Sequence, residues 1–219
     1  MIQKFLKKEG RPSLLLIFGG WGTWPGLFSG YSYPEGSDVL LCCDYRNPDF
    51  DAGLLTGYGS VDLVAWSMGV WTAAHVLAGP GLEDCPLKRR IAVNGTMYPV
   101  DDLRGIPARV FEGTLERMSR PVLDKFVRRM CGKNLEEYLS RRPERSPEEL
   151  KDELAALYTA VKESGVCPDF RWDIAVIGRD DMIFPAENQR RAWTGVRTAE
   201  MDAPHYGKEL FEYAIGRND

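Results

Sequence analysis

Short apolar segments recur along the chain, separated by stretches in which apolar positions repeat every three to four residues. Six of these segments lack the strict alternation of a sheet that has one face in water. A nearly continuous apolar run bounded by glycine or polar residues is typical of a strand that is covered on both faces. The predicted strands are residues 13–18, 39–43, 61–65, 91–94, 173–177 and 196–201.

Helical patterns lie between the predicted strands, at residues 69–77 and 185–193 among others. Alternation of strand and helix predicts an α/β fold, with a mainly parallel sheet and helices on both faces. This alternation is interrupted once, between residues 98 and 168, where no strong strand is found.

The interrupting segment is helical in pattern, at residues 120–130, 134–141 and 147–163. The last of these begins with a strong start signal, because Ser146 can cap the helix, Pro147 suits its first position and Glu149 can complete a capping box. We expect residues 98–168 to form a helical lid over the carboxyl edge of the sheet. Residues 1–97 and 169–219 then form the core.

Composition limits the classes that remain. The chain has 219 residues, 44% hydrophobic and 27% charged, which suits one globular domain with an insertion. Its apolar runs reach only about five residues, far below the roughly 20 of a membrane helix. The first ten residues have no apolar stretch of the secretory kind. We therefore expect a cytoplasmic protein with no membrane partner.

Charge and cysteine usage exclude two further classes. The net charge of -4 argues against a general nucleic-acid binder. The cysteines are odd in number and lack the paired spacing of a zinc site or a disulfide framework, so reduced thiols and no metal or other cofactor are expected. They are Cys42, Cys43, Cys85, Cys131 and Cys167.

The strongest chemical signal is the pentapeptide 65–69, Ala-Trp-Ser-Met-Gly, between a predicted strand and a predicted helix. A serine on such a sharp turn projects its hydroxyl above the sheet, and small residues two positions before and after let the two backbones approach. The pattern favours Ser67 as a nucleophile. The alternative is a serine that only caps the helix.

A serine hydroxyl needs a base to remove its proton, and the chain holds two histidines. His75 is eight residues beyond Ser67 on the same predicted helix, about 12 Å along the axis, and cannot reach it. His205 follows the last predicted strand, at the sheet edge where catalytic loops lie in α/β folds. His205 is therefore the predicted base.

An acid must orient that base. Residues 178–185 follow the fifth predicted strand and contain two adjacent carboxylates, Asp180 and Asp181. Asp181 fits the pattern Gly-x-x-Asp-x-x-apolar-Pro and is preferred, with Asp180 as the alternative. The resulting order Ser67, Asp181, His205 is that of α/β-hydrolases.

Backbone N–H groups must meet the oxyanion that forms during acyl transfer. We expect one from Met68, the residue after the nucleophile, and one from Trp21 in the loop Gly19-Gly20-Trp21-Gly22. Glycines in that loop allow close approach to a substrate.

Dinucleotide binding is the competing interpretation of the same loop. Gly20-x-Gly22 follows a strand, and Asp44 ends the next strand where a ribose-binding acid could lie. Pro25 occupies the third glycine position, however, and this segment is poorly suited to open the helix that would bind pyrophosphate.

Together these motifs resemble the α/β-hydrolase superfamily. The run Trp-Ser-Met-Gly-Val-Trp at 66–71, the short length and the minimal N-terminal extension are similar to the BioG family, the pimeloyl-[acyl-carrier protein] methyl ester esterases of biotin synthesis. The resemblance covers essentially the whole chain. Two departures from common hydrolase patterns, Gly19 in place of histidine and Ala65 in place of glycine, remove no required donor.

The resemblance implies a serine carboxylesterase that hydrolyses the methyl ester of pimeloyl-[acyl-carrier protein] to methanol and the free acid. It also implies an acidic carrier protein as partner, which related esterases bind through lid arginines. Residues 117–145 carry a net charge of +5, while the remainder of the chain carries -9. The alternative is a merely solvated basic surface. The candidate carrier contacts are Arg117, Arg120, Arg128 and Arg129.

Two other functions remain compatible with the sequence. A thioesterase or a generic carboxylesterase would use the same three side chains, because they determine acyl transfer and not the leaving group. A non-catalytic ligand-binding protein could also retain the fold.

Overall fold

The computed structural model describes residues 1–141, 145–165 and 168–216; Arg142, Glu144 and Cys167 lie outside the described residues. Its centre is a sheet with strand order β1-β3-β2-β4-β5-β6-β7. The strands are β1 (Ile2–Lys7), β2 (Ser13–Phe18), β3 (Ser37–Cys43), β4 (Ser60–Trp66), β5 (Leu87–Val93), β6 (Ile174–Gly178) and β7 (Arg197–Met201).

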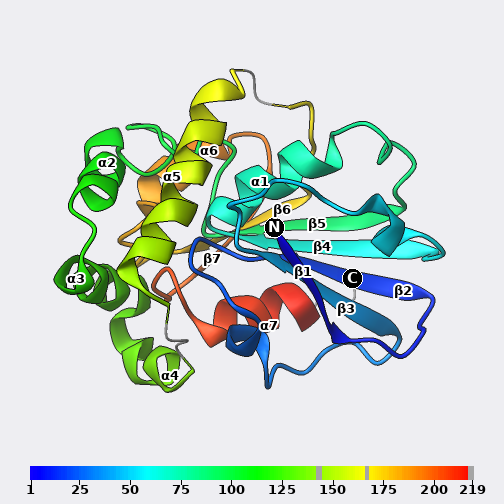
Figure 1. The fold of residues 1–219 in the computed structure, drawn as a ribbon. Helices are drawn as coiled ribbons and strands as arrows, with labels where there is room; N and C mark the ends of the chain where they lie inside the picture. Colours follow the sequence, from blue (N-terminus) through cyan, green and yellow to red (C-terminus); the bar gives the residue numbers. More distant parts are fainter. Residues whose placement is uncertain (142–144, 166–167, 217–219) are drawn as a thin grey trace.

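All neighbouring strands are parallel except β1, which pairs antiparallel with β3 at one edge. The mainly parallel α/β sheet that the apolar runs predict is therefore confirmed. Helices cover both faces: in Figure 1, α1 and α6 lie above the sheet and α7 lies below it. Their bounds are α1 (Met68–Leu77), α6 (Ala186–Ala192) and α7 (Lys208–Gly216).

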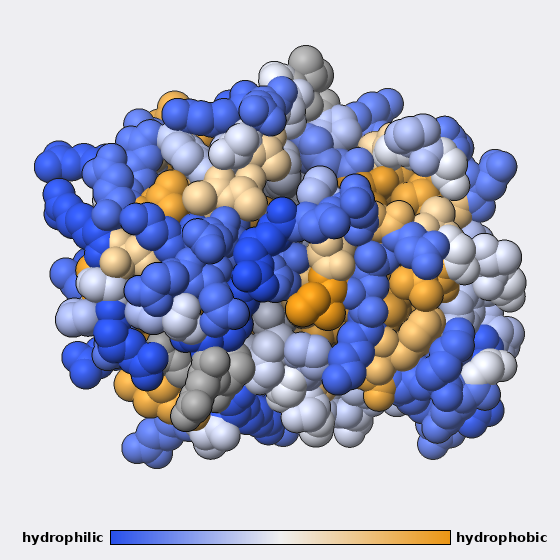
Figure 2. Space-filling model, in the orientation of Figure 1, coloured by the Kyte–Doolittle hydropathy of each residue, from blue (hydrophilic) through white to orange (hydrophobic). Residues whose placement is uncertain are grey.

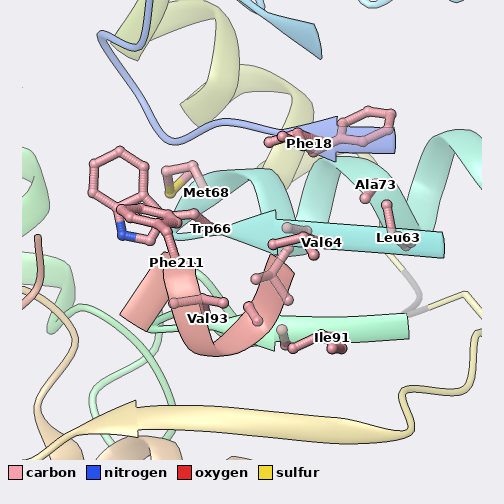
Figure 3. Close-up of a cluster of buried hydrophobic side chains, with 14 of the residues drawn as sticks. Phe18, Leu63, Val64, Trp66, Met68, Ala73, Ile91, Val93 and Phe211 are labelled. Carbon is pink, nitrogen blue, oxygen red and sulfur yellow. The ribbon is translucent and has the colours of Figure 1, made fainter. Parts of the chain in front are cut away.

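The central strands are apolar on both faces because both faces are covered. In β2, every residue from Leu14 to Phe18 is at most 1% exposed. Figure 3 shows the core beside β4, where Trp66 lies next to Phe211 of α7. The two rings meet edge-on with centroids 5.4 Å apart, so α7 packs directly under the end of β4. That strand end carries the turn to α1.

The sequence pattern missed β1 and placed the start of β5 too late, at residue 91 instead of Leu87. Both errors have one physical cause. β1 is an edge strand with Lys4 and Lys7 among its six residues, and the first half of β5 carries Lys88, Arg89 and Arg90. Partly exposed strands need no continuous apolar run, so periodicity alone does not reveal them.

Between β5 and β6 the chain forms helices instead of strands, as predicted. They are α2 (Ala108–Glu116), α3 (Arg120–Cys131), α4 (Leu135–Ser140) and α5 (Pro147–Glu163). The expected capping box is present at the start of α5, where Ser146 and Glu149 exchange side-chain to backbone hydrogen bonds. Short 3-10 helices lie at Pro25–Phe28, Ala52–Leu55 and Gly132–Asn134.

Helices α2 to α5 gather at one side of the molecule, at the carboxyl ends of the parallel strands (Figure 1). Figure 2 shows predominantly hydrophilic side chains over this region, with small hydrophobic areas between them. The division into a core and a lid, with boundaries at residues 98 and 168, stays a prediction. Within the described ranges, no helix has the length and apolar character needed to cross a bilayer.

Candidate active site

A strained turn joins β4 to α1 at Ser67. Its backbone angles are φ 59° and ψ -128°, and its hydroxyl makes no capping hydrogen bond to the helix that follows. A side chain at position 69 would lie 2.3 Å from the Gly19 carbonyl oxygen, so Gly69 is required for strand and helix to approach. The geometry is that of a turn that presents its serine, and the helix-cap alternative for Ser67 does not apply.

His205 lies directly against this serine. Its Nε2 is 2.9 Å from Ser67 Oγ, and its Nδ1 is 2.8 Å from Asp181 Oδ2. All three residues are buried. Because a carboxylate only accepts, Nδ1–H donates to Asp181, and Nε2 is left free to accept the serine proton.

The second histidine is engaged elsewhere. His75 Nδ1 lies 2.9 Å from the Trp71 carbonyl oxygen, and its ring packs on the Trp71 ring with centroids 4.1 Å apart. Burial lowers the pKa of His75. This histidine is part of the packing of α1.

The Asp181 carboxylate is fixed by donors on both oxygens. Oδ1 accepts the backbone N–H groups of Ile183 and Phe184 at 2.8 and 2.9 Å, and Oδ2 accepts Gln189 Nε2 at 3.0 Å besides His205. Of the two adjacent acids, Asp181 faces the imidazole, whereas Asp180 is exposed. A carboxylate with four donors cannot rotate away from its histidine without losing several hydrogen bonds.

The loop that carries His205 is held by a buried amide at the end of β5. Asn94 Nδ2 donates to the carbonyl oxygens of Pro204 and His205, both at 3.0 Å, and its Oδ1 accepts the Gly178 N–H at 2.6 Å. Trp66 Nε1 also donates to the His205 carbonyl oxygen at 3.0 Å. Three strand ends are thereby tied to the position of the imidazole.

Backbone strain concentrates at the same edge of the sheet. Among the described residues, Asp44, Ser67 and Asn94 are the non-glycine residues with positive φ, at 55°, 59° and 43°. Each is the residue directly after a strand, β3, β4 or β5. Such conformations are unfavourable and cluster at sites that the surrounding structure holds in place.

The glycine-rich loop after β2 packs on the serine. A side chain at Gly20 would lie 2.9 Å from Ser67 Cβ, so no larger residue fits there. In the part of the chain that the structure describes, neither the Trp21 N–H nor the Met68 N–H donates a hydrogen bond to another residue. Both residues line the same cavity as Ser67.

That cavity has a volume of about 360 Å³, within the range of small-molecule sites. Ser67 and His205 lie in its wall, α2 and α3 supply much of the remainder, and α5 contributes Leu154. Its apolar lining includes Ile106, Phe111, Phe126, Met130, Leu154 and Ile183.

Four cationic side chains of α2, α3 and their connection also line the cavity. In the described ranges none of the four forms an ion pair. Of the predicted lid arginines, Arg117 and Arg129 are at the cavity, Arg120 pairs instead with Asp124 at 3.5 Å, and Arg128 is exposed outside it. The four cations are Arg109, Arg117, Lys125 and Arg129.

Asp44, the acid of the dinucleotide alternative, is occupied by an ion pair. Its Oδ1 accepts Arg46 Nε at 2.8 Å, and this hydrogen bond lowers the pKa of Asp44 despite partial burial. Arg145 lies 3.9 Å from the same carboxylate and 2.8 Å from Glu153. Burial raises the pKa of Glu153, and the neighbouring Arg145 opposes this shift.

Several residues around the site were not found from the sequence. Asn94 forms hydrogen bonds with residues 84 to 111 positions away in the sequence. Gln189 forms hydrogen bonds with residues 5 to 8 positions away. Neither residue belongs to a recognisable motif. The sequence does mark Glu153 as unusual, because a charged residue stands there on the apolar face of α5 between Leu150 and Leu157. Arg109 lies before residues 117–145, the segment with a net charge of +5. No group of three or more metal-binding side chains occurs among the described residues.

Known proteins resemble this chain over most of its length. A family model described as pimeloyl-ACP methyl esterase BioG matches residues 1–214. A protein of Haemophilus influenzae named only as uncharacterized is 39% identical over 211 residues, which is 94% of each chain. The crystal structure of BioG from Haemophilus influenzae superposes with a TM-score of 0.87 at 36% identity, covering 98% of this chain and 99% of that one.

A longer relative has a different name. A Bacteroides fragilis protein named malonyl-[acyl-carrier protein] O-methyltransferase is 42% identical over 209 residues. The match covers 92% of this chain and 41% of that protein. This chain thus spans less than half of the protein that the name describes.

More distant structures share the fold alone. An esterase from Exiguobacterium antarcticum superposes with a TM-score of 0.68 at 15% identity, covering 97% of this chain and 91% of that one. The sheet order and the turn at Ser67 give this chain the α/β-hydrolase architecture. On the match to residues 1–214, the chain belongs to the BioG family of pimeloyl-ACP methyl esterases.

Proposed function

We propose that this protein is a serine esterase that removes the methyl group from the pimeloyl chain of an acyl-carrier protein. The observation that carries the proposal is the buried hydrogen-bonded chain from Asp181 through His205 to Ser67, which ends in the wall of a cavity. Membership of the BioG family supports the substrate. We expect the reaction to need no metal or other cofactor.

In the proposed first half-reaction, Ser67 Oγ attacks the ester carbonyl carbon while His205 Nε2 takes the serine proton. Asp181 stabilises the imidazolium that results and keeps Nδ1 protonated. The carbonyl oxygen becomes an oxyanion, which the N–H groups of Trp21 and Met68 would bind, because neither donates a hydrogen bond to another of the described residues. His205 then gives its proton to the methoxy group, and methanol leaves an acyl-enzyme.

In the second half-reaction a water molecule replaces the alcohol. His205 takes a proton from that water, the resulting hydroxide bonds to the acyl carbon, and a second tetrahedral oxyanion forms. Its collapse breaks the bond to Ser67 Oγ, and the proton on His205 returns to the serine. The products are the free carboxylic acid on its carrier and regenerated enzyme.

We further propose that the insertion acts as a lid and that its cations hold the acidic carrier. The cations at the cavity are unpaired in the described ranges, so a docking anion would not have to displace an internal partner. Complementary charge increases the rate of association and orients the partner. Arg117 and Arg129 are favoured over Arg120 and Arg128 because they line the cavity.

The test of the serine mechanism is the Ser67→Ala variant. We expect it to fold, with a circular-dichroism spectrum like that of the wild type, and to lose at least about 10³-fold in ester hydrolysis. His75→Asn serves as the control, because His75 lies on α1 with its ring against Trp71 and does not line the cavity. Wild-type turnover by Ser67→Ala would refute the proposal.

The test of the substrate compares leaving groups and chain lengths. We expect the methyl ester of the carrier-bound seven-carbon diacid to react faster than shorter and longer diacid esters, and faster than the thioester of the same carrier. Faster release of the acyl chain from the thioester would identify a thioesterase instead.

A further inference from the structure

A carboxylate of the helical insertion is buried beneath the glycine-rich loop of the sheet. Glu153, in α5, is 0% exposed. Its Oε2 accepts the Gly22 N–H at 3.3 Å, and its Oε1 accepts the Tyr45 N–H at 3.4 Å. One side chain of the insertion thus holds backbone groups of the loops after β2 and after β3. In Figure 1, α5 lies between the other insertion helices and the strand ends.

The charge of Glu153 is compensated within the same cluster. Arg145 Nη1 donates to Glu153 Oε2 at 2.8 Å, and Arg145 also lies 3.9 Å from Asp44, which pairs with Arg46. Positive and negative groups therefore alternate along the series Arg46, Asp44, Arg145 and Glu153. A carboxylate can stay buried in this arrangement, because Arg145 compensates its charge and backbone N–H groups satisfy its remaining oxygen lone pairs.

The loop that Glu153 contacts is a tight turn. Thr23 N–H donates to the Gly20 carbonyl oxygen at 3.1 Å, and Gly22 has φ +73° whereas Trp21 does not have positive φ. These features define a type II turn. Rotation of the Trp21–Gly22 peptide plane, which glycine permits, would convert it to type I and turn the Gly22 N–H away from Glu153. The turn would then lose this anchor to α5.

The Trp21 ring provides a second attachment to the same helix. Its Nε1 donates to the Leu150 carbonyl oxygen of α5 at 2.8 Å, and the ring meets Phe126 of α3 edge-on with centroids 5.0 Å apart. The ring contacts restrain the side chain, but they do not determine the orientation of the next peptide plane. That orientation is selected by the acceptor at Gly22.

We propose that Glu153 is a positioning residue that anchors the Gly20–Thr23 turn to α5 through the Gly22 N–H, and so keeps the Trp21 N–H of the same turn directed toward the reacting carbonyl. The inference rests on the proposed esterase function. It makes the oxyanion donor dependent on the insertion, since the anchor of the turn belongs to α5. Oxyanion donors are effective only when they are held in place before the reaction. Loss of this anchor reduces turnover more than substrate binding.

Stability alone does not account for the cluster. A buried ion pair contributes little net stability compared with apolar residues of the same size, and α5 already packs through Leu150, Leu154 and Leu157. Replacing both partners by apolar side chains therefore removes the anchor without leaving a buried charge. This substitution separates the positioning role from a structural one.

Three variants test the proposal in the full-length enzyme. Glu153→Gln keeps one oxygen acceptor, the double variant Arg145→Met/Glu153→Leu removes the anchor together with its partner, and Leu157→Ala is the control. Leu157 is buried on the same helix and does not line the cavity. Its truncation lowers Tm by about 10 °C through lost packing alone.

The measurements are kcat and KM for a small aryl ester at 25 °C, and the affinity for an aryl trifluoromethyl ketone. Ser67 adds to that ketone to form a hemiketal oxyanion, so its affinity reports on the oxyanion donors. We expect kcat to fall about tenfold in Glu153→Gln and about 30- to 100-fold in the double variant, with KM within about threefold. Ketone affinity falls in the same order, and Leu157→Ala keeps wild-type values.

Two results would overturn the inference. One is a folded double variant, or Glu153→Gln if the double variant does not fold, with wild-type kcat and ketone affinity. The other is an equal loss in Leu157→Ala, which indicates general damage to α5. A wild-type enzyme that hydrolyses no ester contradicts the proposed function itself, and this inference with it.

Discussion

Two buried carboxylates at opposite ends of the sheet are held by nearly the same set of donors. Asp38 lies at the start of β3 and Asp181 follows the end of β6, and both side chains are 0% exposed. In each, Oδ1 accepts two backbone N–H groups and Oδ2 contacts two side chains. For Asp38, Oδ1 accepts the N–H groups of Glu9 and Arg11, and Oδ2 accepts the Tyr58 hydroxyl and forms an ion pair with Lys8 Nζ at 3.5 Å.

The two carboxylates differ in the surroundings of the cationic or imidazole side chain that contacts Oδ2. Lys8 extends from Asp38 to the surface, where its side chain is 52% exposed. His205 extends from Asp181 to Ser67 and to a cavity. Similar local chemistry therefore serves stability at the amino ends of the strands and, in the proposed mechanism, proton transfer at the carboxyl ends. Burial and hydrogen bonding of an acid do not by themselves identify a catalytic group.

The largest effect expected from this comparison is the loss of activity in Asp181→Asn. An amide at this position would donate to His205 Nδ1 and hold the imidazole in the wrong tautomer, so kcat falls about 10⁴-fold. Asp38→Asn is the matched control, and its kcat/KM at 25 °C stays within about twofold of the wild type. Steady-state kinetics on a small aryl ester measure both. Equal losses in the two variants would remove the distinction between the two ends of the sheet.

A smaller loss of activity is expected at Asn94. Glycine suits the positive φ of this position, so Asn94→Gly relieves backbone strain while it removes the amide that holds the His205 loop. We expect kcat to fall about 10- to 100-fold because the imidazole is less well placed. Unchanged kcat would show that Trp66 alone suffices to hold the loop.

Charge at the cavity should matter for the carrier substrate alone. Reversal of Arg117 and Arg129 to glutamate is expected to lower kcat/KM for the carrier-linked ester about tenfold or more at low salt, while hydrolysis of a small aryl ester changes little. Reversal of Arg120 and Arg128 changes net charge equally, outside the cavity, and is expected to have a smaller effect. Equal losses from the two pairs would indicate general attraction and not a specific contact.

The smallest effect is expected at Asp38, at the amino ends of the strands. It concerns the stability of the protein and the pH dependence of that stability. Burial would raise the pKa of Asp38, but its donors outweigh burial and lower the pKa from 3.8 to about 2. A lowered pKa contributes stability above pH 3.8 that is lost as the pH falls toward 2. Thermal unfolding should show Asp38→Asn less stable by about 1–3 kcal/mol at pH 7, with the difference shrinking between pH 4 and 2. A constant difference over this range would contradict the assignment.

The sequence predicted the fold wherever burial on both faces forces apolar runs. Strands β2 and β4 were found for this reason, whereas β1 was missed because its lysines lie at a sheet edge. The insertion was found as a helical segment, and the capping box at Ser146 located the start of α5. Its predicted role as a lid does not follow from helical periodicity.

The candidate site was predictable to the extent that local patterns carry it. Ser67 lies in a recognisable turn motif, and His205 followed because the chain has only one other histidine. Asp181 followed from a loop pattern, and its contact with the imidazole distinguishes it from Asp180. Asn94 could not be assigned in this way, because its partners lie as many as 111 residues away and only the folded chain brings them together. The position of Glu153 on the apolar face of α5 marks it as unusual, but its partner Gly22, 131 residues away, cannot be read from that pattern.

The most direct test of the central claim is covalent labelling with a fluorophosphonate, followed by mass spectrometry of the intact protein and of its peptides. The account predicts a single adduct, located on Ser67, which forms at the rate at which esterase activity is lost. An adduct on another residue, or full loss of activity without modification of Ser67, would contradict it.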